Sequence, residues 1–166
     1  MTKLLTILAI FINLLIPINT TAQSEAFTIK SIKLTTTVQK VSGDDLKANS
    51  DIMDNTAINQ GDDLCSNGNA YIAGHSSPTK RRQKAGRVFA NLHKVKRGDI
   101  VTSKDCKYEV RSVTILTGKA NRDGISYHFT KKEADFVKEN TFENGTLTLQ
   151  TCTKQLGQIL VIKAIK

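Results

Sequence analysis

Short stretches of alternating or continuous apolar residues recur along this chain between polar turns. Alternation with a period of two is typical of a half-buried β-strand, and a short apolar run bounded by turn residues indicates a buried one. These patterns predict strands at 27–34, 35–41, 70–75, 100–105, 107–116, 146–152 and 159–166. About seven or eight short strands with few helices predict a mainly β protein built as one closed barrel.

The segments between these strands are mostly polar. Residues 42–69 are rich in Asn and Asp and read as a loop, with a short helix near Leu46 as an option. Residues 86–92 are compatible with another short helix, KVKRGD is expected to turn, and 131–140 is either a helix or a loop. TKQLGQ (153–158) is expected to join the last two strands.

The strand TLTLQTC, residues 146–152, ends in a candidate nucleophile. Period-two geometry sends Leu147 and Leu149 to one face and Thr148, Gln150 and Cys152 to the other. A cysteine at a strand end is often a small core residue. Here it shares the polar face and lies where the strand leaves the barrel, so we interpret Cys152 as a site residue.

A thiol needs a nearby base or cation to be nucleophilic near neutral pH. His75 is the best candidate, because it also ends a predicted buried strand, after Ala73 and Gly74. His93 and His128 are surrounded by charged or loop residues, and we interpret them as surface histidines.

Composition adds bounds on size and surroundings. A chain of 166 residues is suited to one compact domain. Residues 1–22 combine Lys3, the apolar run 4–18 and a small-residue site before Gln23, which is typical of a secretory signal peptide. An uncleaved anchor is the alternative, although a spanning helix needs about 20 apolar residues. Residues 23–166 would then form the working domain outside the cytoplasm. The net charge of +9 favours anionic surroundings without choosing among them.

Three cysteines in an oxidising compartment leave two possibilities open. Either Cys65 and Cys106 pair and Cys152 is left over, or all three are thiols. The spacing of cysteines and histidines does not match a zinc site, so no metal is expected.

Four stretches, in order, carry a resemblance to a known family: YIAGHS, FANLHKVKRGDIV, KYEVRSV and TLTLQTC. Each alone is common by chance. Together, ending in a TLxTC strand, they make the chain resemble the sortases, a family of bacterial cysteine transpeptidases. The resemblance covers approximately residues 27–166.

The resemblance implies an eight-stranded β-barrel with one or two short helices in its connections. It implies that Cys152 attacks a sorting signal of LPxTG type between Thr and Gly, and that a thioester acyl-enzyme is then resolved by an amine. His75 would act as general acid and base. Thr151, Ala73 and Gly74 would lie on the substrate side. The implied partners are proteins bearing the signal and an amine acceptor, such as a peptidoglycan precursor or a pilin lysine, at the bacterial cell surface and near the membrane. No cofactor and no nucleic acid are implied.

One position departs from the family pattern. Sortases carry an arginine on the last strand, and here that position falls on Gln158 or Ile159. The Gln158 amide can donate a hydrogen bond to an oxyanion, but it lacks the charge and fork of a guanidinium. A loop arginine is the rival: Arg81, Arg82 or Arg87.

Two other functions therefore stay open beside the active enzyme. One is a catalytically impaired sortase-fold binding module, which the missing arginine favours. The other is a small secreted basic barrel that binds polyanions, which the charge favours but which leaves Cys152 and His75 without a role.

Overall fold

The computed structural model describes residues 25–41, 52–54, 56–76, 88–117, 119–121, 124–128, 143–153 and 158–166. The predicted leader, the helix options at Leu46 and 131–140, and the loop arginines lie outside these ranges. Within them, no helix is long and apolar enough to cross a membrane.

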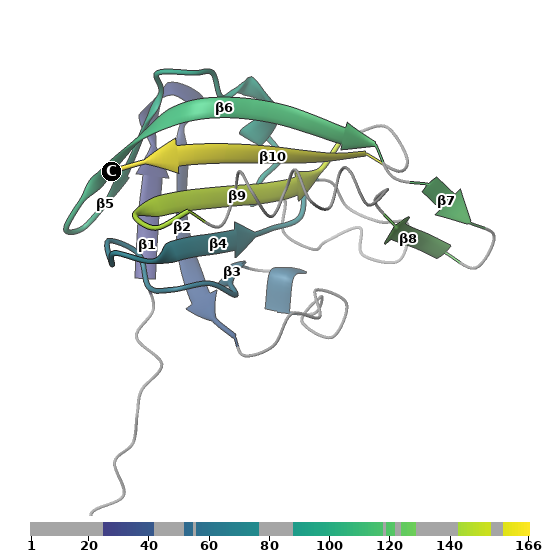
Figure 1. The fold of residues 1–166 in the computed structure, drawn as a ribbon, viewed down its shortest axis with the longest axis horizontal. Helices are drawn as coiled ribbons and strands as arrows, with labels where there is room; N and C mark the ends of the chain where they lie inside the picture. The colour runs from purple at the N-terminus through teal and green to yellow at the C-terminus, as the bar shows by residue number, and fades with distance from the viewer. Residues whose placement is uncertain are drawn as a thin grey trace, which may run out of the picture.

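Eight strands close into one barrel in the order β1-β2-β3-β4-β9-β10-β6-β5 (Figure 1). Two neighbouring pairs, β2–β3 and β4–β9, are parallel and the others are antiparallel. The predicted mainly β barrel is thus confirmed. The strands of the barrel are β1 (Glu25–Ile29), β2 (Leu34–Lys40), β3 (Ala57–Asn59), β4 (Asn69–Ala73), β5 (Ile100–Ser103), β6 (Lys107–Thr117), β9 (Thr146–Cys152) and β10 (Gln158–Ile165).

The remaining elements are short. Three 3-10 helices lie in the connections: η1 (Lys30–Ile32), η2 (Ile52–Asp54) and η3 (Leu92–Lys94). A two-stranded hairpin of β7 (Lys119–Asn121) and β8 (Gly124–His128) projects to one side of the barrel in Figure 1.

Three local predictions were wrong. The strand expected over 27–34 ends at Ile29, because η1 and the left-handed Lys33 (φ 54°) turn the chain back into β2. The expected loop 42–69 contains β3, whose three residues are all buried. The short helix expected over 86–92 is instead a turn at 88–91 followed by η3.

The core fills the inside of the barrel and comes from every strand of the closed sheet. Phe27 and Phe89 pack with their ring centroids 6.2 Å apart, and Phe89 is fully buried although it comes from the segment before η3. This segment therefore lies over the barrel interior near the end of β4. Close packing of this kind fixes the positions of the strand ends.

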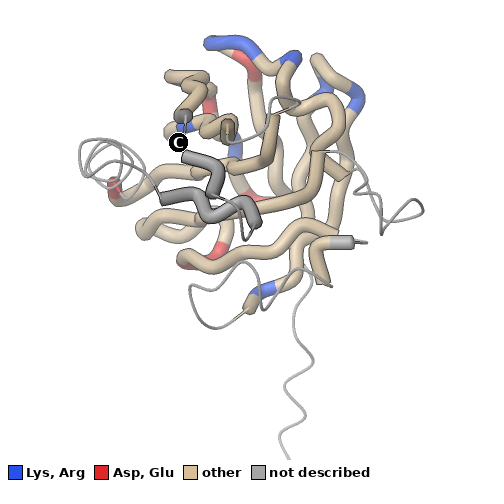
Figure 2. Tube along the Cα trace, turned by 90° about the vertical axis from the view of Figure 1, so that its right-hand side faces the viewer, with Lys and Arg blue, Asp and Glu red and all other residues tan. Residues whose placement is uncertain are grey.

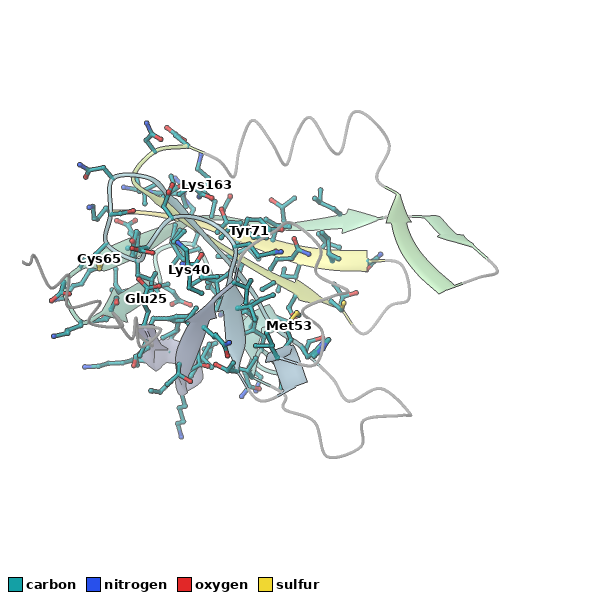
Figure 3. The ribbon with its side chains drawn as sticks, turned by 90° about the horizontal axis from the view of Figure 1, so that it is seen from below. Glu25, Lys40, Met53, Cys65, Tyr71 and Lys163 are labelled. Atoms are coloured by element: carbon teal, nitrogen blue, oxygen red, sulfur yellow. A yellow bond between two sulfur atoms is a disulfide. The ribbon has the colours of Figure 1, made fainter. Side chains whose placement is uncertain are left out.

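A disulfide joins Cys65, in the loop after β3, to Cys106, in the β5–β6 turn, with the two Cα atoms 5.5 Å apart. One of the two possibilities left open by the sequence is therefore realised. The Tyr108 hydroxyl accepts a hydrogen bond from the Cys65 N–H at 2.7 Å, which further anchors the loop. In Figure 3, Cys65 and Glu25 lie near the same end of the barrel, with Met53 further along toward β7 and β8.

Candidate active site

Cys152 lies at the end of β9 and carries a thiol that is half-buried. It pairs with Ile159 of β10. The face that Cys152 shares with Thr146 and Thr148 is polar, as the alternation predicts, but both threonines are fully buried rather than facing solvent. The Asn69 amide Nδ2 donates to the Thr146 and Thr148 hydroxyls at 2.6 and 3.2 Å. These hydrogen bonds compensate the buried hydroxyls and tie β9 to β4.

The end of β4, which leads into His75, lies beside the end of β9, which carries Cys152. In the parallel β4–β9 ladder, Ala73 pairs with Gln150, and the Gly74 N–H donates to the Gln150 carbonyl at 3.2 Å. Extended by two residues, this register aligns the backbone of His75 with that of Cys152. The His75 side chain is half-buried, with its Nε2 atom inside the protein.

Two further contacts hold this strand end. The Thr151 hydroxyl donates to the Gly74 carbonyl at 2.7 Å, and the Phe89 N–H donates to the His75 carbonyl at 3.0 Å. The residues before Cys152 and before His75 are thus hydrogen-bonded to each other. Such buried hydrogen bonds restrict the movement of one strand end relative to the other.

Gly74 has a steric reason to be glycine. A Cβ atom at this position would lie 2.7 Å from Val88 Cγ1 and 2.8 Å from Phe89 Cδ2. Any larger residue would push the 88–89 segment away or displace the backbone that carries His75.

Two neighbouring residues of β10, Gln158 and Ile159, are the candidates for the position at which sortases carry an arginine. Ile159 pairs directly with Cys152 but is 1% exposed and apolar. Gln158 is half-buried beside it, and its backbone carbonyl accepts from the Thr153 N–H at 3.1 Å. The Thr153 hydroxyl donates to the Gln158 Oε1 atom at 3.3 Å. This hydrogen bond engages the amide oxygen, and the Nε2 atom of the same amide carries the N–H donors.

A hollow of about 460 Å³ opens beside Cys152 and has a mostly apolar lining. From its charged neighbours we interpreted His93 as a surface histidine. It is exposed on η3, and it also lines this hollow. Its neighbour Lys94 is exposed, as the sequence suggested, but the fold places η3 at the edge of the hollow beside Cys152. The complete lining is Ser76, Phe89, Ala90, His93, Val113, Ile115, Thr151, Cys152, Thr153, Gln158 and Leu160.

The substrate-side residues proposed from the sequence lie around the same strand ends. Ala73 and Thr151 are 1% and 4% exposed, and Gly74 is buried. Thr151 borders the hollow, and its hydroxyl is engaged with the Gly74 carbonyl. Their contact with substrate stays a prediction.

Burial changes the pKa of two tyrosines, Tyr71 of β4 and Tyr108 of β6. Burial raises the pKa of the Tyr71 phenol well above its ordinary value, so the group is neutral in the folded protein. Burial also raises the pKa of Tyr108, next to the disulfide. Over the described ranges, no group of three or more His, Cys, Asp or Glu side chains is placed to hold a metal ion.

Comparison with protein families gives a match to the Sortase domain over residues 27–164. The chain belongs to the sortase family. The members of this family are cysteine transpeptidases, and the matched region contains the β4 and β9 ends described above. No curated protein matches this sortase.

Solved structures support the same fold. Sortase A of Listeria monocytogenes is 20% identical, with a TM-score of 0.56 over 85% of this chain and 84% of that one. The Clostridium perfringens sortase D5 transpeptidase is 22% identical, with a TM-score of 0.55 over 86% and 77%. Sortase C2 of the Group B Streptococcus pilus island 1 is 19% identical, with a TM-score of 0.54 over 84% and 71%.

Proposed function

We propose that this sortase is an active cysteine transpeptidase whose nucleophile is Cys152. The observation that supports the proposal is the parallel β4–β9 register, which, extended by two residues, aligns the backbone of His75 with that of Cys152 and its half-buried thiol. The same two residues are the ones that the family resemblance assigns to covalent catalysis.

The chemistry has two steps. In the first, the Cys152 sulfur attacks the Thr carbonyl of an LPxTG-type signal, the Thr–Gly C–N bond breaks, and His75 gives a proton to the leaving amine. In the second, an amine attacks the thioester, the C–S bond breaks with its electrons returning to sulfur, and His75 takes the proton from the new amide nitrogen. A neutral Gln158 is proposed to donate a hydrogen bond to the negative oxygen formed in both steps.

The proposed donors are proteins with the sorting signal, and the proposed acceptor is an amine on the cell envelope, such as a peptidoglycan precursor or a pilin lysine. Residues 1–22 are proposed as the signal peptide that takes the domain 23–166 to the bacterial cell surface, with an uncleaved anchor as the alternative. The disulfide agrees with an oxidising compartment.

A second function has a specific observation in its favour. The residue paired directly with Cys152 is the apolar Ile159, and the hollow at the thiol has no Lys or Arg among its described lining residues. A sortase-fold module that binds a sorting signal without turning it over would fit this arrangement. The polyanion-binding alternative gains less, because the described Lys and Arg are spread over several separate segments in the view of Figure 2.

Cleavage of a fluorogenic LPxTG-type peptide distinguishes the two functions. We expect cleavage between Thr and Gly by the wild type and its loss in Cys152→Ala and in His75→Ala. Ser112→Ala, an exposed position on β6, serves as the control and should cleave normally. Peptide binding without cleavage by the wild type would support the binding module instead.

A further inference from the structure

Basic residues that are spread over separate segments of the chain meet on one side of the barrel. The β1–β5 register, extended by one residue, aligns the backbone of Lys30 in η1 with that of Ile100 in β5. The turn at 96–99 leads directly into Ile100, so η1 and this turn are neighbours in space. In Figure 1 the β1–β2 connection that contains η1 lies at the top of the view, and Figure 2 shows blue segments along the same edge.

The basic surface is made by four side chains of these two segments. Lys30 and Lys33 belong to η1 and its C-cap, and Lys96 and Arg97 belong to the turn. All four are exposed, and none forms an ion pair with another residue that the structure describes. Asp99 is the one acidic residue of 30–33 and 96–99, and its Oδ2 atom accepts a hydrogen bond from the Lys96 N–H at 2.9 Å. The basic surface therefore keeps a net positive charge.

The opposite end of β1 carries the reverse charge. A second hollow, of about 580 Å³, lies there, and Glu25, Asp63 and Asp105 line it. Lys104 is the one basic residue among its described lining. Charge is therefore distributed unevenly along the barrel, and such a distribution orients an approaching polyanion toward the basic surface.

The residues around the basic surface argue against two anionic partners. Proteins that bind single-stranded nucleic acid stack its bases on aromatic side chains, and 30–33 and 96–100 contain no aromatic residue. A surface that lies in a bilayer interface presents a whole apolar face. Here Ile100, 45% exposed, is the one exposed large apolar side chain of the two segments. A polymer with charges along a flexible chain needs only spaced cations.

The attachment of the N-terminal segment favours the same kind of partner. Residues 1–24 precede Glu25 and so join β1 at the end opposite η1. If the leader holds the protein at a membrane, as in the anchor alternative, the basic surface lies at the end of β1 away from that attachment. It would then face the material outside the membrane.

We infer that the basic surface binds a linear anionic polymer of the cell surface whose charges are phosphodiesters, and thereby holds this sortase on that polymer. Repeated phosphates along one polymer chain contact the cations of η1 and of the turn together. The inference goes beyond the proposed function, because such binding involves neither Cys152 nor His75.

Binding of an end-labelled synthetic poly(glycerol phosphate) tests the inference. Its Kd for the chain of residues 1–166 is measured by fluorescence anisotropy in neutral detergent at several salt concentrations. We expect Lys96→Gln combined with Arg97→Gln to raise the Kd about tenfold. The slope of log affinity against log salt should become shallower by about two, because each lost phosphate contact removes about one. Lys30→Gln combined with Lys33→Gln should give similar changes, since both segments contribute to one surface.

Lys104→Gln combined with Lys107→Gln is the matched control. Both lysines are exposed near the β5–β6 turn, so this pair removes the same charge at another place. Its Kd should stay within about twofold of the wild-type value, because salt screens charges farther away than about 8 Å. All three double variants should keep the thermal stability and the peptide cleavage rate of the wild type.

Three outcomes would overturn the inference. Equal losses of affinity in the surface and control variants would show that only net charge matters. Binding to phosphatidylglycerol vesicles that depends on the basic surface, without binding to the polymer, would assign the surface to a bilayer. The leader is the same in every variant, so differences between variants report on the surface. Binding of single-stranded DNA of equal phosphate number more than about tenfold tighter than the polymer would indicate base contacts.

Catalysis and polymer binding can fail separately. Cys152→Ala should bind the polymer as the wild type does, so a protein without transpeptidase activity leaves this inference standing. A wild type that cleaves the sorting peptide but does not bind the polymer overturns this inference and leaves the proposed function standing.

Discussion

We expect the hydrogen bond from Thr151 to Gly74 to align the strand ends that carry Cys152 and His75, and Thr151→Val tests this. The valine keeps the shape of the side chain and removes the hydroxyl that donates to the Gly74 carbonyl at 2.7 Å. Thr151 is 4% exposed, so the carbonyl is left in a buried place without that donor. Leaving a buried acceptor unsatisfied costs about 1–3 kcal/mol of the free energy of unfolding.

For a domain of this size, a loss of about 2 kcal/mol lowers the Tm by about 4–8 °C. We also expect kcat to fall by more than the loss of folded protein explains. Gly74 precedes His75 and Thr151 precedes Cys152, so a shift between the two strand ends would change the distance between His75 and Cys152. Small displacements of reacting groups cost up to about a hundredfold in rate, so we expect kcat to fall about ten- to a hundredfold.

Thr148→Val is the matched control. Thr148 is fully buried on the same strand, and its hydroxyl accepts from Asn69 at 3.2 Å, away from the thiol. Thermal unfolding and initial rates of peptide cleavage are measured for both variants at a temperature where both are folded. The control should lose comparable stability and keep a kcat close to that of the wild type. Equal losses of kcat in the two variants would refute the aligning role.

Three other predictions concern the oxyanion donor, the disulfide and the buried phenol. Gln158→Ala should lower kcat about ten- to a thousandfold without unfolding the protein, whereas an unchanged rate together with a collapse in a variant of Arg81, Arg82 or Arg87 would favour the loop arginine. Replacing both Cys65 and Cys106 by serine should cost about 4 kcal/mol by loop entropy at a separation of 41 residues, measured by urea unfolding; a cost below about 1 kcal/mol would contradict the anchoring role. Burial raises the pKa of Tyr71 in the folded protein, so above about pH 10 this phenol ionises in the unfolded chain and stays neutral in the fold. The free energy of unfolding therefore falls as the pH rises above about 10. Urea midpoints should therefore fall less between about pH 8 and pH 11 in Tyr71→Phe than in the wild type, and equal falls would contradict it.

The sequence was informative where local periodicity and tertiary structure agree. The alternation in TLTLQTC and the apolar run before His75 are local patterns, and both give strands. The first ends at the predicted residue, Cys152, whereas the second, predicted over 70–75, ends at Ala73. The parallel pairing of these strands is a non-local fact, which no local pattern predicts and which the structure supplies.

Short and non-local features were not readable in the same way. β3 has three residues, too few for a periodic signal, and its burial comes from its neighbours in the barrel. The two cysteines of the disulfide are separated by 41 residues, and nothing local fixes their Cα distance. His93 has charged neighbours in the sequence, and its place at the hollow follows from where the barrel carries η3.

The central claim is that Cys152 forms a covalent acyl-enzyme. Its most direct test is the intact mass of the protein after incubation with an LPxTG-type peptide and no added amine, followed by proteolytic mapping. We expect an adduct with the mass of the peptide through its Thr residue, bound at Cys152, absent in Cys152→Ala and removed by an added amine. An unmodified wild-type mass under conditions where the peptide is shown to bind would contradict the claim.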